Sequence, residues 1–227
     1  MSSPIAKSKK SFFDKLLISF HRKTSHNSRI EILSDLIFKD LRFLMEKENL
    51  ESIKCLDIGC GDLTLSESIS EKDSAISFTG IDIHEVPEAL KDVGKWKNYV
   101  HFDGKNMPFD DNSFDSALFS DVLHHDYENI EILLKEAKRV SKYIVIKDHF
   151  EYGFFSRKIL QLADIIGNYG YGISIPKRYL SLKSYDKCIS ECGLTEVKRL
   201  TPIHLYDHSP LVKIIFKSKY QFISILK

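Results

Sequence analysis

The chain contains 227 residues with a formal net charge of +1; 43% of the residues are hydrophobic and 29% are charged. This length suits one domain with a large core, with or without a small cap, and the composition is typical of globular proteins. The small net charge gives no field that favours nucleic acid. No apolar run reaches transmembrane length, and Asp14 and Lys15 interrupt the run that a signal peptide would need. We therefore expect a cytoplasmic protein that does not bind nucleic acid.

The four cysteines do not form the pattern of a disulfide framework. Two lie in or beside a glycine turn and two are four residues apart in an expected helix: Cys55, Cys60, Cys188 and Cys192. This spacing is also a poor match to a zinc site. We therefore expect free thiols in a reducing compartment and no bound metal.

The first 52 residues are expected to form helices that precede the main domain. Residues 1–10 are small, polar and basic, which predicts disorder. Over residues 12–20, apolar side chains recur at helical spacing beside basic ones. We favour a helix that packs on the domain; the alternative is a basic amphipathic helix that contacts a membrane surface or covers an apolar substrate. A second helix is expected over residues 29–48, with Asn27 or Ser28 as its cap.

Short apolar strands alternate with helical segments through the middle of the chain. Strands are expected at residues 53–58, 76–81, 99–102, 114–119 and 143–146, and helices at residues 63–70, 87–95 and 129–140. After Phe150 the pattern changes, with helices expected at residues 154–166 and 182–192 and strands at residues 194–200 and 220–226. This order predicts the α/β class: a Rossmann-like, seven-stranded, mostly parallel sheet with helices on both faces and an antiparallel C-terminal edge. We expect one domain over residues 53–227, with an insertion at about residues 150–190.

Polar side chains stand at the end of every expected parallel strand. They are Asp57, Asp82, Asp103, the pair Ser120-Asp121 and the pair Asp148-His149. Because the carboxyl ends of parallel strands meet at one edge of a sheet, these side chains share one crevice. The turn Gly59-Cys60-Gly61 follows the first strand, where glycines allow a tight turn and a close approach of a ligand. Carboxylates beside that turn repel a pyrophosphate and suit a ligand with hydroxyl groups and positive charge.

S-adenosylmethionine (SAM) is such a ligand, because it carries a ribose diol, an amino group and a sulfonium. The sequence resembles class I SAM-dependent methyltransferases, in particular the small-molecule group (methyltransferase type 11) that includes quinone-biosynthesis enzymes. The resemblance rests on three stretches: LDIGCG at residues 56–61, GID at residues 80–82, and DG, MPFDDNSFD and DVLHH within residues 103–125. It is close over about residues 28–150 and holds only in outline beyond them.

The resemblance implies a cofactor role for each matching residue. Asp57 and the turn Gly59-Cys60-Gly61 would line the methionine end of SAM, and Ser120 would lie near the methionine and the departing methyl group. Asp82 would accept hydrogen bonds from both ribose hydroxyls, which requires a two-oxygen acceptor. The adenine would be met by Ile83, Asp103 and Gly104: Ile83 packs on the ring, Asp103 accepts from the amino group, and Gly104 gives clearance.

The catalytic step needs orientation and proximity first, because the methyl group on a sulfonium is already activated. A general base is needed only when the acceptor is a poor nucleophile, such as a hydroxyl or an enolisable carbon. The candidates are His124, His125, Asp148 and His149, and we select His125 and His149. Each is equally consistent with a loop or capping histidine. Metal binding by His124, His125 and Asp126 with the later pair ranks low, because adjacent histidines rarely share one metal.

The insertion is rich in Phe, Ile, Leu and Tyr, so the expected acceptor is a small, apolar or lipid-like molecule. Tyr169, Tyr171 and Tyr179 would line its pocket or simply pack in the core. Two departures from the family pattern are Leu63, where a third glycine is common, and residues 140–142, which replace a Pro-Gly-Gly turn.

Two other classes of function remain open from the sequence. An NAD-dependent oxidoreductase would place a ribose-binding acid near Asp82, but its fingerprint needs a glycine where Thr64 stands. A non-catalytic partner subunit with a SAM-binding fold is the second alternative. The oligomeric state does not follow from the sequence.

Overall fold

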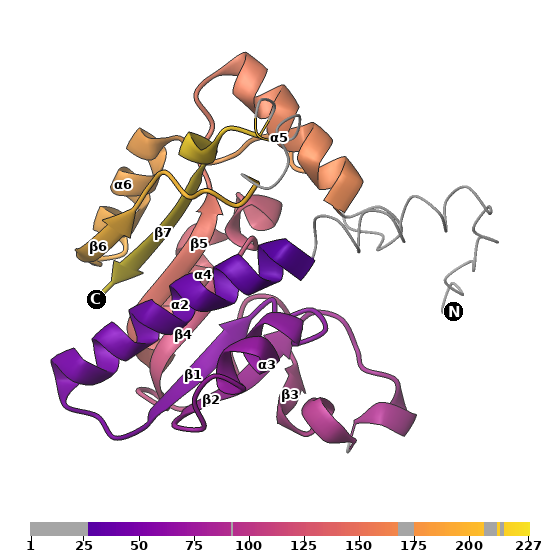
Figure 1. Ribbon diagram of the computed structural model, residues 1–227, viewed down its shortest axis with the longest axis vertical. Coiled ribbons are helices and arrows are strands. Elements are labelled where there is room, and N and C mark those ends of the chain that lie inside the picture. The colour runs from indigo at the N-terminus through magenta and orange to yellow at the C-terminus, as the bar shows by residue number, and fades with distance from the viewer. Residues whose placement is uncertain (1–26, 92, 168–174, 207–212, 214–215) are drawn as a thin grey trace.

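The computed structural model describes residues 27–91, 93–167, 175–206, 213 and 216–227. The helix expected over residues 12–20 and the two loop tyrosines Tyr169 and Tyr171 lie outside these residues. Figure 1 shows the described chain as one twisted sheet with helices on both of its faces. Within the described residues, no helix is both long and apolar enough to cross a membrane.

The sheet has seven strands in the order β3-β2-β1-β4-β5-β7-β6. They span Ile53–Ile58 (β1), Ile76–Asp82 (β2), Tyr99–His101 (β3), Phe114–Ser120 (β4), Ser141–His149 (β5), Glu196–Leu200 (β6) and Gln221–Leu226 (β7). The first five strands are parallel, whereas β7 runs antiparallel to both β5 and β6. The predicted mostly parallel sheet with an antiparallel C-terminal edge is therefore confirmed.

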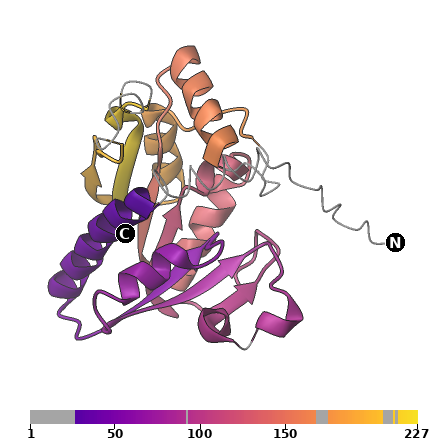
Figure 2. The ribbon, with the colours of Figure 1, turned by 45° about the vertical axis from the view of Figure 1, so that its right-hand side comes forward.

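The described part of the chain contains five α-helices. They span Asn27–Glu48 (α2), Thr64–Ser70 (α3), Ile130–Val140 (α4), Phe154–Gly167 (α5) and Leu182–Glu191 (α6). Apolar side chains of α2 and α3 pack on one face of the sheet, and those of α4 and α6 pack on the other. Figures 1 and 2 show α2 lying across one face. Both faces are thus buried, which explains why the central strands are continuously apolar.

The side chains of β4 show how one strand serves both cores. Ala117 and Phe119 belong to the cluster under α4, whereas Leu118 belongs to the cluster under α2, and all three are at most 1% exposed. Leu33 and Ile37 of α2 are fully buried in the second cluster. The division of the chain at residue 52 remains a prediction, and α2 contributes directly to this sheet core.

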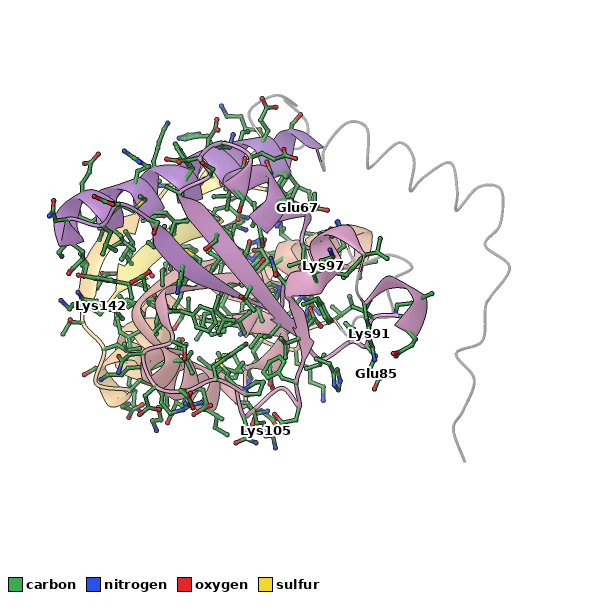
Figure 3. All side chains as sticks on the ribbon, turned by 90° about the horizontal axis from the view of Figure 1, so that it is seen from below. Glu67, Glu85, Lys91, Lys97, Lys105 and Lys142 are labelled. Carbon is green, nitrogen blue, oxygen red and sulfur yellow. The ribbon has the colours of Figure 1, made fainter. Side chains whose placement is uncertain are left out.

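The helix predicted over residues 87–95 is wrong. The structure has two short 3-10 segments instead, Glu88–Leu90 (η2) and Gly94–Asn98 (η3). Gly94 has φ +54, which ends any right-handed helix that would cross it. Figure 3 shows Glu85 and Lys91 of this region at the right-hand side of the molecule, and Lys97 is exposed as well. The segment buries too little apolar surface to stabilise a regular helix.

The fifth strand is longer than its apolar run. It was expected over residues 143–146, but it continues through Lys147, Asp148 and His149. These three residues pair in register with β7 at Ile223, Phe222 and Gln221. Their polar side chains are tolerated inside the sheet because they contact one another and neighbouring charges, as described next.

Candidate active site

The glycine turn between β1 and α3 is tied to the neighbouring strand. The backbone N–H groups of Gly59 and Cys60 both donate to the carbonyl of Ile81, at 2.8 and 3.2 Å. Gly59 has φ +69, and a Cβ at this position would lie 2.6 Å from a methyl carbon of Val122. A glycine is therefore required here for its backbone conformation and for the close packing of the turn against residues that follow β4.

Asp57 lies in β1 beneath this turn and is only 3% exposed. Its carboxylate accepts a hydrogen bond from Ser66, and no ion pair involves it within the described residues. Burial, with a smaller effect from the charge of Asp82, raises the pKa of Asp57 to about 7, against the lowering effect of the Ser66 hydrogen bond. A buried carboxyl group with a raised pKa favours a cationic ligand, such as the amino group of SAM, because the positive charge stabilises its ionised form.

Asp82 ends β2 and already uses both of its carboxylate oxygens. One oxygen accepts from the backbone N–H of Gly61 at 2.9 Å and the other from that of His84 at 3.1 Å. The two hydrogen bonds fix the carboxylate beside the glycine turn. Each oxygen retains further acceptor capacity, so the geometry fits the predicted contact with a ribose diol.

The predicted adenine residues follow the carboxyl ends of two strands: Ile83 follows β2, and Asp103 and Gly104 follow β3. Ile83 is 57% exposed, and a Cβ on Gly104 would lie 3.1 Å from its side chain, so these residues are adjacent. Asp103 is exposed, and its carboxylate accepts from the backbone N–H groups of Lys105 and Asn106 at 2.8 and 2.7 Å. These hydrogen bonds lower the pKa of Asp103 to about 2. The exposed Ile83 surface beside Gly104 suits a flat ring.

Arg139 of α4 holds the loop that follows. Its guanidinium donates to the carbonyl groups of Phe109 and Met107 at 2.7 and 2.9 Å. Glu136, one turn earlier, accepts from Arg139 and from the backbone N–H of Met107. The loop that carries Asp103 is thereby fixed to the helix layer.

Leu63, where the resemblance led us to expect a glycine, adopts a backbone conformation that glycine favours. Its φ is +63, it caps the N-terminus of α3, and its side chain is 4% exposed. Its Cδ2 would lie 2.3 Å from a Cβ on Gly80. The helix therefore begins at Thr64, one residue later than expected, and the apolar burial of Leu63 accompanies an unfavourable φ.

A cluster of buried and half-buried charged side chains lies at the carboxyl ends of β4 and β5. We call it the charged cluster, and it comprises Arg29, Asp121, His124, Lys147, Asp148, His149 and Asp164. Ser120, the predicted methionine neighbour, pairs in register with Lys147 on β5 and is half-buried. The charged cluster therefore borders the predicted cofactor site.

Asp121 forms ion pairs with two cationic side chains of this cluster. Arg29 of α2 and the fully buried Lys147 of β5 pair with its two oxygens, and Nδ1 of His149 lies 3.3 Å from one of them. Burial raises the pKa of Asp121, but the charges of Lys147 and Arg29 outweigh this and lower it. Asp121 has φ +58, an uncommon conformation for a residue other than glycine.

The pKa values of the two buried histidines, His124 and His149, are shifted in opposite directions. Nδ1 of His124 lies 2.6 Å from Asp148, and its Nε2 lies 3.8 Å from Asp164 of α5. Burial lowers the pKa of His124, but the charge and hydrogen bond of Asp148 outweigh this and raise it. Burial and the charge of Lys147 lower the pKa of His149. Of the two histidines, His124 is therefore favoured in its protonated form and His149 in its neutral form.

The cluster contains two cationic side chains, Arg29 and Lys147, and three carboxylates, Asp121, Asp148 and Asp164. One further proton balances these charges, and His124 is placed to carry it between Asp148 and Asp164. The sequence did not predict that Arg29, Lys147 and Asp164 belong to this cluster. Lys147 gave a faint signal, as a lysine at the end of an apolar strand.

His125 lies beside this cluster. It is half-buried, and its ring centroid lies 4.2 Å from that of His124. Tyr179, expected in the acceptor pocket or the core, is 2% exposed; it donates to Asp164 and stacks 5.5 Å from His124. Tyr179 therefore fixes α5 to the cluster.

The nitrogen and oxygen atoms of Asp121, His124, Asp148 and His149 lie within 4.8 Å of one another, close enough to hold a metal ion. However, Asp121 already pairs with Lys147 and Arg29, and Asp148 pairs with His124. A metal would have to displace these partners and lie beside buried cations. We therefore assign no metal here.

Part of the chain is similar in sequence to known proteins. Residues 56–143 match the family described as a methyltransferase domain. The chain is 29% identical over 118 residues to a ubiquinone biosynthesis O-methyltransferase of Pelagibacter ubique, over 50% of this chain and 48% of that protein. It is 36% identical over 100 residues to a demethylmenaquinone methyltransferase of Staphylococcus epidermidis, over 39% of each chain. The chain thus matches less than half the length of these curated relatives.

The fold has solved counterparts as well. The structure of a SAM-dependent methyltransferase from Methanosarcina mazei matches with a TM-score of 0.55 and 20% identity, over 78% of this chain and 92% of that one. At that identity the match shows the fold alone. Residues 56–143 thus resemble a methyltransferase domain, and the chain has the fold of a SAM-dependent methyltransferase, in agreement with the predicted resemblance and with SAM as the expected cofactor. The residues at Asp57, Gly59, Asp82 and Gly104 fit that cofactor.

Proposed function

We propose that the protein transfers the methyl group of SAM to a hydroxyl group on a small, apolar, quinol-like acceptor. The single observation that supports a hydroxyl acceptor is the setting of His149. Its Nδ1 faces the carboxylates of Asp121 and Asp148 at 3.3 and 3.4 Å, and its pKa is lowered. A neutral imidazole held in this way keeps its proton on Nδ1 and a lone pair on Nε2.

In this proposal Asp57, Asp82 and the glycine turn hold the cofactor, and Asp121 and Asp148 orient His149. SAM, when bound, supplies a methyl group on a positively charged sulfur. His149 accepts the hydroxyl proton at Nε2 as the acceptor oxygen forms its bond to the methyl carbon and the carbon–sulfur bond breaks. Lys147 and Arg29 keep the orienting Asp121 ionised. The two carboxylates then stabilise the imidazolium that forms.

The relatives support the class of acceptor. The two named above act, by their names, in ubiquinone biosynthesis and on demethylmenaquinone. Both names describe apolar ring compounds, in agreement with the apolar insertion after β5. His125 was the other predicted base; its distances place it next to His124, and we propose it as a neighbour of the site rather than the base.

The test begins with calorimetric titration of the purified chain with SAM, its demethylated product and NAD. We expect micromolar binding of SAM and its product, and Asp82→Ala should weaken both about tenfold or more. Heat with NAD but none with SAM would reverse the cofactor assignment. Binding of SAM without transfer to any acceptor would instead support the partner-subunit alternative.

The second step compares His149→Gln with the matched control His125→Gln in transfer to a panel of quinols that carry a free hydroxyl. Loss of a general base lowers the rate by about 10²–10⁴-fold. We expect that loss for His149→Gln, with partial recovery at high pH where the acceptor ionises by itself. A loss confined to His125→Gln would move the base to that residue.

A further inference from the structure

Helix α5 exposes a continuous apolar face. Phe154, Phe155, Leu162 and Ile165 are 63%, 82%, 45% and 47% exposed, whereas Leu160 of the same helix is 2% exposed. At about 100° per residue, the four exposed residues fall within an arc of about 100° on one side of the helix. Single exposed apolar residues need no explanation, but a contiguous group marks an interaction surface.

The charges around this face have one sign. Lys158 lies within the same arc, with its Nζ 5.7 Å from the ring of Phe154. Exposed basic side chains of the neighbouring segments are Lys177, Arg178 and Lys219. The face itself therefore presents aromatic and aliphatic groups among lysines and an arginine.

The acidic residues of this region do not offset those charges at the surface. Residues 151–182 contain two, Glu151 and Asp164. Glu151 forms a two-bond ion pair with Arg157 at 2.7 and 2.6 Å, and Asp164 is 9% exposed and turned towards His124. The exposed charge of the α5 region is positive, so it complements an anionic surface.

The dimensions of α5 suit a helix that lies on a bilayer. It has 14 residues, which span about 21 Å and are too few to cross a hydrocarbon core. Aromatic residues on one side, with lysine at their edge, are the features of a helix that lies in the plane of a lipid interface. Tyr152, two residues before α5, is 51% exposed, and the ammonium of Lys219 lies 5.2 Å from its ring centroid.

We propose that the face of α5 formed by Phe154, Phe155, Lys158, Leu162 and Ile165 docks on an anionic lipid bilayer. Helix α5 begins five residues after His149, and Asp164 and Tyr179 fix it to the charged cluster. Docking through this face holds the carboxyl end of β5 near the bilayer. Resting on the proposed function, this places the site where an apolar acceptor is dissolved.

The test is co-sedimentation of the full chain with vesicles of phosphatidylcholine, with or without phosphatidylglycerol. We expect binding that rises with phosphatidylglycerol and falls with salt. The double substitution Phe154→Ser/Phe155→Ser should weaken it about tenfold or more, because two exposed aromatic rings no longer enter the interface. Lys158→Glu should lower binding to the anionic vesicles more than to the neutral ones. Phe43→Ser, at a 37% exposed position on α2, is the matched control and should have no effect.

Four results would overturn the proposal. They are no vesicle binding, equal binding by the double variant, loss of binding only in Phe12→Ser/Phe13→Ser, and a concentration-dependent dimer that the double variant abolishes. The third would assign the contact to residues 12–20, and the last would assign the face to a second copy of the chain. SAM titration and transfer to a water-soluble acceptor are unchanged in the double variant. The vesicle experiment therefore tests the docking proposal even if the proposed function fails, and the transfer assays test the proposed function even if vesicle binding fails.

Discussion

Replacing Asp57 with asparagine should stabilise the ligand-free protein in a pH-dependent way while weakening its binding of SAM. The carboxyl group is 3% exposed, and its pKa is raised from an ordinary 3.8 to about 7. Below pH 3.8 both folded and unfolded chains hold the proton, so the group has no effect on stability. As the pH rises from there to about 7, the unfolded chain releases its proton before the folded one, and stability is lost.

The magnitude follows from the two pKa values. The shift from 3.8 to about 7 corresponds to an upper limit of about 4 kcal/mol, at about 1.4 kcal/mol per pKa unit. Asparagine has a similar shape without the charge, so Asp57→Asn should recover most of this loss above pH 7 and little of it near pH 4. Chemical denaturation of both proteins between pH 5 and pH 8 measures the difference directly.

The reasoning would be refuted by a stability difference that does not change with pH. Ligand provides an internal control, because SAM at about 100 times its dissociation constant stabilises a binding protein by about 2.7 kcal/mol. We expect that gain in the wild-type protein and a smaller one in Asp57→Asn. Ser66→Ala is the matched variant: it removes the hydrogen bond that lowers the pKa of Asp57 and should steepen the pH dependence.

Three further predictions concern the supports of the site. Gly59→Ala should cost more stability than Gly61→Ala, because both glycines have positive φ but only Gly59→Ala would place a Cβ against Val122. Thermal denaturation of each variant measures this difference. The double variant Gly59→Ala/Val122→Ala removes the clash and leaves the backbone strain, which is about 1–3 kcal/mol. Arg139→Ala should cost about 2 kcal/mol, because two loop carbonyls lose their donors, and urea titration would show no change if water replaces them. Lys147→Met should cost about 3 kcal/mol, because a buried carboxylate loses one of its two cations, and it should move the acidic limb of the pH–rate profile to higher pH; an unshifted limb would contradict the charge effect on His149.

The sequence predicted the sheet and the acidic residues at its strand ends well, because both follow from local patterns. Apolar runs end in Asp57, Asp82 and Asp103, and each run forms a strand of the sheet or leads out of one. The helix over residues 87–95 failed because one glycine with positive φ outweighs a helical pattern that little burial supports. Local pattern also predicted too short a fifth strand, because it ended the strand at the first polar residue.

The charged cluster was only partly visible from the sequence. The strand ends at Asp121 and Asp148 were evident, but Arg29 reaches Asp121 across 92 positions in the chain. No local period or motif encodes such a contact. The raised pKa of His124 was not evident from the sequence for the same reason, because it depends on Asp148 and Asp164 from two other elements.

The position of Arg29 has a consequence for where this protein can be divided. The family match begins at residue 56, but one of the two cations paired with Asp121 is Arg29, which lies on the first turn of α2. A chain shortened to residues 53–227 would lack Arg29 and would also uncover the surface that Leu33 and Ile37 bury. Lys147 would then face Asp121 alone. Helix α2, which precedes the matched residues, therefore supplies a counter-charge to the charged cluster.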